Sequence, residues 1–170
     1  MDKLTGLFEL QSFMTRFDDE VKRAARFHRP LGLLLVAWAR QQEFQEYSQW
    51  TARGSGMLRQ LANVLKKNMR DIDVAARVDG EMLAALLPET NLAGTQIVAE
   101  RFCRDAASHE FIGESYENVV LLSVCAGYVA FPEHSDDAHE LLFMARQGLE
   151  LARQAGFNIA TEGQKDPTAP

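Results

Sequence analysis

The chain has 170 residues, a length that suits one domain with a single hydrophobic core. Apolar residues make up 46% of it and charged residues 25%, which are the fractions of an ordinary soluble globular protein. The formal net charge of −6 argues against DNA or RNA as a partner, because a protein that binds nucleic acid needs a broad basic face. A small anionic ligand in a local basic pocket remains compatible with this charge.

The sequence carries no sign of a metal motif, a leader or a membrane segment. Cys103 and Cys125 belong to no CxxC pair, so two buried thiols are expected. Met1 is followed by Asp-Lys-Leu-Thr rather than by a basic and then apolar signal sequence. The longest apolar run, residues 31–39, is too short to span a bilayer. We therefore expect a cytoplasmic location, with no membrane partner.

The first half of the chain alternates helical and strand patterns. Apolar residues recur at helical spacing over residues 9–27, which predicts an amphipathic helix. Residues 31–39 form a continuous apolar run of strand length, which predicts a central buried strand. Residues 40–52 are polar with scattered aromatic residues and predict a short helix or a loop. A second amphipathic helix is predicted over residues 57–69.

The middle of the chain predicts a hairpin and a third helix. Two short apolar runs, 74–78 and 82–87, flank Asp79-Gly80, and this dipeptide between two such runs is a strong hairpin signal. Asn91 is a suitable N-cap for a helix that ends near residue 108.

The last third of the chain predicts one strand, one helix and a tail. Residues 119–131 are rich in strand-forming residues, and Asp136 or Asp137 is expected to cap a helix over 138–154. Residues 161–170 are polar with two prolines and predict a flexible C-terminal tail. A hairpin between helical crossovers implies a mixed sheet with helices packed on it, in the α/β or α+β class.

Several segments carry a family resemblance through their common order and spacing. They are Asp2-Lys-Leu-Thr-Gly-Leu, Arg29-Pro-Leu-Gly-Leu-Leu-Leu, Leu61-Ala, Arg70-Asp-Ile-Asp-Val-Ala-Ala-Arg, Leu86-Leu-Pro-Glu-Thr, Val98-Ala-Glu-Arg and Ala155-Gly-Phe-Asn. In this order they resemble the GGDEF family of diguanylate cyclases, from residue 2 to about residue 160. The resemblance implies a nucleotidyl-cyclase-like fold, a central five-stranded and mostly antiparallel sheet surrounded by helices. It also implies one domain over residues 1–160, followed by the tail 161–170.

The resemblance implies that the catalytic residues are missing. The signature hairpin, G-G-D/E-E-F in the family, falls on Asp79, Gly80, Glu81, Met82 and Leu83. The family holds Mg²⁺ with an aspartate at the end of the first strand and with the fourth residue of the signature. These positions are Ala37 and Met82 here, and Ala39 replaces a further aspartate of the first strand. Since Mg²⁺ demands hard oxygen ligands, we expect a degenerate domain with no catalytic residues, no metal and no cofactor, which is not an enzyme.

The substrate positions implied by the resemblance are changed as well. The family's guanine-binding asparagine and aspartate match Gln45 and Ser55, and the alignment near Ser55 is open by one residue. Asp79 replaces the first glycine of the signature, and its carboxylate would repel a triphosphate. Of two basic phosphate contacts on the last helix, one is kept as Arg153 and the other is Phe157.

A second family site, which binds the product cyclic di-GMP, is retained in its residue types. It consists of an R-x-x-D motif before the hairpin, here Arg70 and Asp73, and a supporting arginine on the next helix, here Arg101. An arginine fork can hold guanine or phosphate, and an aspartate can accept hydrogen bonds from the guanine edge. An R-x-x-D motif at a helix end can equally be a solvated ion pair, and Asp71 could compete for Arg70.

Two functions therefore follow from the sequence. The first is a cyclic di-GMP sensor or effector that uses Arg70, Asp73 and Arg101. The alternative is a nucleotide-independent module for protein interaction or homodimer formation, derived from a diguanylate cyclase.

Overall fold

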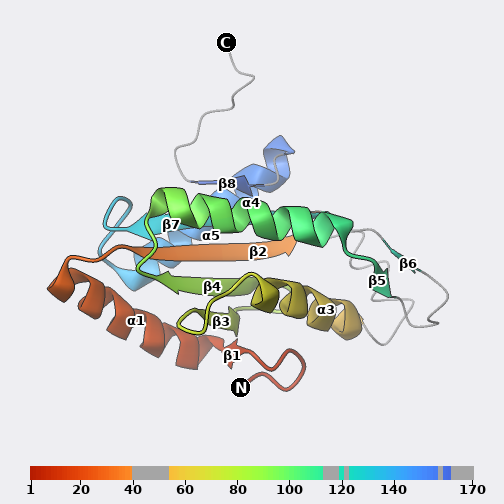
Figure 1. Cartoon of the computed structure of the whole chain (residues 1–170), viewed down its shortest axis with the longest axis horizontal. Coiled ribbons are helices and arrows are strands. Elements are labelled where there is room, and N and C mark those ends of the chain that lie inside the picture. Colours follow the sequence, from red (N-terminus) through yellow and green to blue (C-terminus); the bar gives the residue numbers. More distant parts are fainter. Residues whose placement is uncertain (40–53, 113–118, 121–122, 157–158, 162–170) are drawn as a thin grey trace, which may run out of the picture.

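The computed structural model of the chain describes residues 1–39, 54–112, 119–120, 123–156 and 159–161. Within these ranges a central sheet lies between helices (Figure 1). The helices are α1 (Leu10–Phe27), α3 (Gly54–Lys67), α4 (Leu92–Ser108) and α5 (Ala138–Ala155). The strands are β1 (Phe8–Glu9), β2 (Leu31–Trp38), β3 (Val74–Arg77), β4 (Leu83–Pro88), β5 (Phe111–Ile112), β6 (Val119–Val120), β7 (Val124–Phe131) and β8 (Ile159–Ala160).

In the part of the chain that the structure describes, the main sheet has six strands in the order β1-β3-β4-β2-β7-β8. The inner strands β3, β4, β2 and β7 are antiparallel neighbours. The two-residue strands β1 and β8 lie parallel to their neighbours at the two edges. The predicted mixed α/β class and mostly antiparallel sheet are thus confirmed. The sheet has six strands rather than the expected five because a short strand pairs at each edge.

Strand β2 lies in the centre of the sheet, and all of its residues are buried. Its side chains alternate between the two faces. Leu34, Val36 and Trp38 pack in the cluster under α3 and α4, whereas Leu33 and Leu35 pack in the cluster under α1 and α5. Burial on both faces explains why its sequence is continuously apolar rather than alternating.

The ends of the long helices follow the predicted capping residues. The side chain of Asn91 accepts a hydrogen bond from the Gly94 amide, and that of Asp137 accepts one from the Glu140 amide. Asp137, and not Asp136, is therefore the cap of α5. Helix α5 ends at Gly156, whose left-handed backbone (φ 76°) is the conformation that glycine adopts at low cost.

One predicted strand is wrong. Residues 119–131 do not form a single strand: β6 pairs with β5 in a separate two-stranded sheet, and β7 begins at Val124 in the main sheet. The predicted helix or loop at 40–52 and the tail beyond residue 161 lie outside the described residues.

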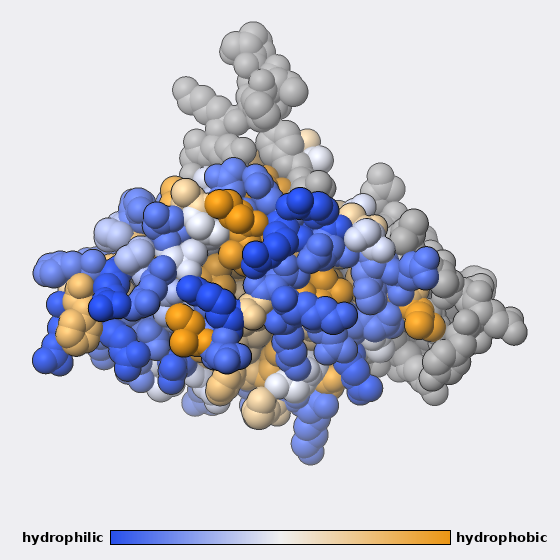
Figure 2. All heavy atoms as spheres, in the orientation of Figure 1, coloured by the Kyte–Doolittle hydropathy of each residue, from blue (hydrophilic) through white to orange (hydrophobic). Residues whose placement is uncertain are grey.

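Single apolar side chains, rather than one continuous area, interrupt the hydrophilic surface over α1, α3 and α4 (Figure 2). No helix in the described ranges combines the length and the apolar character needed to cross a bilayer. Cys103 and Cys125 are both buried thiols, as predicted. Burial raises the pKa of Cys103 to about 12, so this thiol stays protonated at neutral pH.

Candidate functional site

Arg70 and Asp73 lie in the loop between α3 and β3 and are in direct contact. The Asp73 carboxylate accepts hydrogen bonds from the Arg70 amide (2.7 Å) and from Arg70 Nη2 (3.2 Å). In return, the Asp73 amide donates to the Arg70 carbonyl (3.0 Å). The aspartate side chain is only 3% exposed, whereas the arginine side chain is 53% exposed. The loop therefore fixes the carboxylate and leaves the guanidinium accessible to a ligand.

The Arg70 guanidinium also reaches the connection between β4 and α4. Its Nη2 donates to the Pro88 carbonyl (2.7 Å) and to the Thr90 hydroxyl (2.8 Å). Arg70 is thus held by the end of the neighbouring strand as well as by its own loop. No local pattern predicts these contacts, because 18 and 20 residues separate the partners in the chain.

Arg101 lies on α4 and contacts the same loop at another point. Its Nε donates to Asn68 Oδ1 (2.8 Å), and its Nη2 donates to the Asn68 carbonyl (2.9 Å). Asn68 is buried, and its Nδ2 donates to the Val64 carbonyl (2.9 Å), which fixes the direction of the amide. The three predicted site residues thus surround one short loop. Arg70 and Asp73 contact each other, whereas Arg101 contacts Asn68, which sequence reasoning missed.

A groove of about 560 Å³ lies beside this loop, between the loop and α1. Asp71 and Asp73 line it on the loop side, and Arg16 and Arg23 line it on the helix side. The buried Glu20 carboxylate lies 3.3 Å from Arg16 Nε and 3.8 Å from Arg23 Nη1. Asp71 is not among the hydrogen-bond partners of Arg70 in the described structure, so the competition considered from the sequence is not seen there.

The Asp79-Gly80 hairpin connects β3 and β4, as predicted. The Val78 amide donates to the Met82 carbonyl (2.9 Å). Asp79 Oδ1 accepts from the amides of Glu81 (3.2 Å) and Met82 (3.0 Å). A glycine in place of Asp79 would lack this carboxylate, so the aspartate has a clear structural role in the turn.

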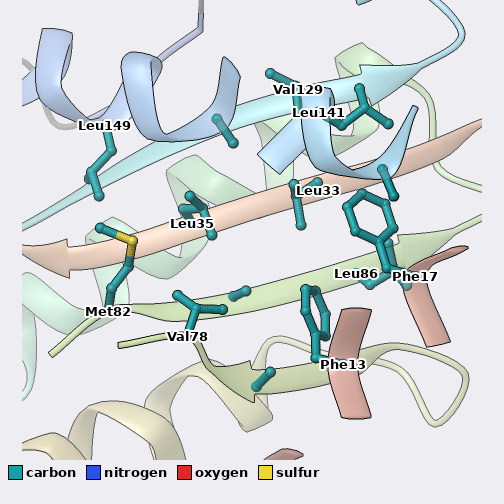
Figure 3. Packing of buried hydrophobic residues seen from close by; sticks show 14 of the residues in the cluster. Phe13, Phe17, Leu33, Leu35, Val78, Met82, Leu86, Val129, Leu141 and Leu149 are labelled. Atoms are coloured by element: carbon teal, nitrogen blue, oxygen red, sulfur yellow. The ribbon is translucent and has the colours of Figure 1, made fainter. Parts of the chain in front are cut away.

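Ala37 and Met82 lie close to this hairpin, within the apolar core. Their exposures are 0% and 8%, and both belong to the cluster that includes Leu35 and Leu149. The Met82 side chain points toward Leu149 of α5 (Figure 3). Cys125 is the partner of Ala37 in the sheet register. Apolar atoms and a thioether therefore fill the space between β2, the hairpin and α5.

Arg153 of α5 lies at the open end of this space. Its Nε and Nη2 both donate to the Trp38 carbonyl (3.1 and 3.0 Å), and its Nη1 donates to Glu150 (3.0 Å). Its Nη2 is also 3.8 Å from Glu81 Oε1. The arginine side chain is 13% exposed. Arg153 therefore connects α5, the end of β2 and the hairpin through one guanidinium.

The fold and these two sites can be compared with known proteins. The family model described as "Diguanylate cyclase, GGDEF domain" matches residues 1–159. The chain belongs to the GGDEF family. The response regulator PleD of Caulobacter vibrioides is 28% identical to this GGDEF domain over 159 residues, which are 92% of the chain and 34% of PleD. The chain thus spans about a third or less of the curated relatives it matches.

Two solved structures have the same fold as this GGDEF domain. The GGDEF domain of YfiN (TpbB) from Pseudomonas aeruginosa superposes with a TM-score of 0.85 at 23% identity, covering 94% of this chain and 99% of that one. The GGDEF domain of DgcB from Caulobacter crescentus, solved in complex with c-di-GMP, gives a TM-score of 0.83 at 20% identity. The match covers 95% of this chain and 94% of that one.

The positions that the sequence resemblance matches to the family's magnesium ligands are Ala37 and Met82. Ala37 and Met82 offer a methyl group and a thioether, neither of which is an oxygen ligand. Ala39 offers only its backbone, and its amide donates to the Ser123 carbonyl (2.9 Å). Among the described residues, no group of three histidine, cysteine, aspartate or glutamate side chains lies close enough together to hold a metal. Gln45 and Phe157, and the side chain of Ser55, lie outside the described residues.

Proposed function

We propose that this GGDEF domain binds cyclic di-GMP at the Arg70–Asp73 loop and does not synthesise it. The observation that carries the proposal is the preformed Arg70–Asp73 pair, in which a buried carboxylate holds an exposed guanidinium. The c-di-GMP complex of the fold neighbour DgcB supports the choice of ligand, since that domain shares the same architecture.

The chemistry of the loop suits a guanine nucleotide with few charges. The exposed Arg70 plane offers a surface on which a base can stack, together with N–H donors for guanine O6, N7 or a phosphate oxygen. The Asp73 side chain is only 3% exposed, so its carboxylate contributes by holding Arg70 in place for the ligand. Arg101, held by Asn68 at the same loop, adds a second positive charge for the phosphates.

The absence of synthesis is proposed from the residues around the hairpin. Attack of a 3′-hydroxyl on an α-phosphate needs a divalent ion to offset the phosphate charge. Ala37 and Met82 are buried in the apolar core, and the Glu81 carboxylate lies near Arg153. These observations support a domain that is not an enzyme, and its role would then be that of a sensor or effector.

Isothermal titration calorimetry with cyclic di-GMP tests the binding proposal. We expect micromolar binding by the unaltered chain, and binding at least about tenfold weaker in Arg70→Ala because a charge-assisted contact is lost. Arg146→Ala changes an arginine of α5 that neither contacts Arg70 nor lines the groove, so it is the matched control and should bind as the unaltered chain does. Equal affinity of Arg70→Ala and the control would contradict the proposal.

Synthesis is tested separately by incubating the chain with GTP and Mg²⁺ and separating the products by chromatography. We expect no cyclic dinucleotide. Any enzyme-dependent cyclic di-GMP peak would overturn the argument from Ala37 and Met82.

The second candidate is a nucleotide-independent interaction module, as a homodimer or with another protein. It is favoured by the internal contacts of Arg70 with Asp73, Pro88 and Thr90, which give the arginine a structural role without any ligand. Under this reading the titration gives no heat, and Arg70→Ala lowers the stability of the fold. Light scattering of the chain, alone and with cyclic di-GMP, would then measure whether association depends on the nucleotide.

A further inference from the structure

We propose that Thr90 is a positioning residue for Arg70, which it holds ready for the ligand. This inference rests on the proposed binding of cyclic di-GMP at the Arg70–Asp73 loop. Thr90 follows β4, on the segment that enters α4, and takes no direct part in the binding proposed above. Its role would be exerted entirely through the guanidinium of Arg70.

The first support is that Arg70 is held at one nitrogen. Among the described residues, the guanidinium has three acceptors, and all of them contact Nη2: the Pro88 carbonyl (2.7 Å), Thr90 Oγ1 (2.8 Å) and Asp73 Oδ1 (3.2 Å). Because Nη2 carries two hydrogens, one of them is shared between two acceptors. Nε and Nη1 have no hydrogen-bond partner among these residues. A guanidinium pinned at Nη2 presents its plane, its Nε and its Nη1 to a ligand in a defined orientation.

The second support is that the threonine hydroxyl is itself oriented. Thr90 Oγ1 lies 3.2 Å from the Pro88 carbonyl and donates to it, so its lone pairs are available to Nη2 of Arg70. The hydroxyl and the carbonyl therefore form a small acceptor site with two separate contacts to the same nitrogen. A side chain of the same shape without the hydroxyl would remove the hydrogen bond from Arg70 Nη2 to Thr90. It would also remove the hydrogen bond that the Pro88 carbonyl accepts from Thr90.

The third support is the backbone between these two acceptors. Glu89 adopts a left-handed conformation (φ 57°), which is uncommon for a residue other than glycine. This residue turns the chain between the Pro88 carbonyl and the Thr90 hydroxyl, which both face Arg70. The Glu89 carboxylate also forms an ion pair with Arg29, which precedes β2. Uncommon backbone conformations of this kind persist where surrounding contacts hold them, and they occur often at functional sites. At Glu89 the conformation places these two acceptors of Arg70.

The expected consequence is preorganisation. An exposed arginine that must be immobilised when a ligand binds loses side-chain freedom, and the loss weakens binding by about three- to tenfold. Thr90 removes part of that loss in advance. Its contribution should therefore appear in the affinity for cyclic di-GMP, and in the motion of the Arg70 guanidinium before any ligand is added.

The test compares Thr90→Val, which keeps the shape and removes the hydroxyl, with Thr90→Ser, which keeps the hydroxyl. Calorimetry with cyclic di-GMP should give an affinity about three- to tenfold lower for Thr90→Val and near that of the unaltered chain for Thr90→Ser. Thr15→Val is the matched control, since the Thr15 hydroxyl is bonded to the Gln11 carbonyl within α1. In the ligand-free protein, NMR should show faster rotation of the Arg70 guanidinium in Thr90→Val than in the unaltered chain and the control.

The outcomes separate this inference from the function on which it rests. No binding by the unaltered chain overturns the proposed function and, with it, a ligand-related role for Thr90. Binding by the unaltered chain with equal affinity in Thr90→Val overturns this inference alone. A weakened Thr90→Ser would also overturn it, because the hydroxyl would then not be the group that matters. Thermal melting of each variant checks that an affinity change does not come from unfolding.

Discussion

Arg70, Arg101 and Arg153 show how one residue type takes different roles through its surroundings. Each of them donates to a backbone carbonyl of a neighbouring element. The side chain of Arg153 is 13% exposed and that of Arg70 is 53% exposed. A nearly buried guanidinium uses its donors for acceptors within the protein. An exposed guanidinium can keep such hydrogen bonds and still offer other donors to a ligand.

Arg153 should contribute measurably to the stability of the fold. Arg153→Met removes two hydrogen bonds to the Trp38 carbonyl and leaves Glu81 and Glu150 without that positive charge. We expect the free energy of unfolding to fall by about 1–3 kcal/mol, measured by urea denaturation. Arg153→Lys should recover only part of this loss, since an ammonium lacks the planar fork. The control Arg146→Met should change stability by less than about 0.5 kcal/mol, and an equal effect of both variants would argue against the role given to Arg153.

Asp2 should make the stability of the protein depend on pH. Asp2 Oδ2 accepts from the Thr5 amide (2.8 Å) and hydroxyl (2.6 Å), and Arg77 lies 3.2 Å from Oδ1. Burial raises the pKa of Asp2, but the two hydrogen bonds from Thr5 and the charge of Arg77 outweigh it, so the pKa lies below its usual value. A lowered folded pKa means that the carboxylate stabilises the fold above its unfolded pKa and loses this effect as pH falls through the folded value.

Asp2→Asn should therefore destabilise the protein by about 1–3 kcal/mol at pH 7. The difference from the unaltered chain should stay constant down to about pH 5 and shrink below about pH 4. Urea denaturation at a series of pH values measures it, with Asp19→Asn as the control on the exposed side of α1. A difference that stays the same at pH 3 would mean that the Asp2 charge contributes nothing.

At the scale of elements, the close approach of α5 to β7 sets a strict limit on one side chain. A Cβ added to Gly127 of β7 would lie 2.1 Å from the Ala145 carbonyl oxygen and 2.4 Å from the Leu149 amide nitrogen, both in the helix backbone. Gly127→Ala must therefore push α5 away from the sheet. We expect a loss of about 3 kcal/mol or more, measured by thermal or urea denaturation.

Gly80→Ala is the matched control for this prediction, since an added Cβ there meets no atom within 4 Å. Its stability should stay within about 0.5 kcal/mol of the unaltered chain. If Gly127→Ala were as stable as the control, that result would contradict the direct packing of α5 on the backbone of β7.

The elements also show what the sequence alone can predict. The helices and the long strands were predicted because their apolar spacing extends over many residues, and the caps Asn91 and Asp137 mark their starts. The two-residue strands β1, β5 and β8 have no measurable period, so only pairing with a partner defines them. The same reason explains the wrong strand at 119–131, where strand-forming residues continue across two separate sheets.

The candidate site was predictable only in its local part. Arg70 and Asp73 are three residues apart, so their contact follows from the loop itself. Asn68 and Thr90 were missed because their roles depend on contacts with Arg101 and Arg70, which are 33 and 20 residues away in the chain. Such partners become neighbours only through the packing of α4 against α3 and the end of β4.

At the scale of the whole molecule, the two sites lie at opposite ends of β2 (Figure 1). Leu31, at the start of β2, pairs with Pro88, whose carbonyl binds Arg70. Trp38, at the other end of the strand, binds Arg153 near the hairpin. Because a rigid buried strand separates them, changes at the hairpin need not disturb the Arg70–Asp73 loop. This separation supports the proposal that a domain can lose synthesis and keep binding.

The two apolar clusters share the sheet, so we expect the domain to unfold as one unit. Phe13 is fully buried in the cluster under α1 and α5, whereas Trp38 lies in the cluster under α3 and α4. In a Trp50→Phe background, Trp38 is the one tryptophan left in the chain and its fluorescence reports its own cluster. Phe13→Ala should lower the free energy of unfolding by about 3–5 kcal/mol. The fluorescence and circular dichroism transitions should move together, because loss of one cluster exposes the sheet that supports the other.

Phe143→Ala provides the matched control for this prediction, because the Phe143 side chain on α5 is 59% exposed. It should leave both transitions within about 0.5 kcal/mol of their original position. A Phe13→Ala protein whose circular dichroism shifts while the Trp38 transition stays in place would contain two independent folding units. We do not expect that result, because adjacent residues of β2 point into the two clusters. Disruption of the sheet on one face therefore removes the packing surface of the cluster on the other face.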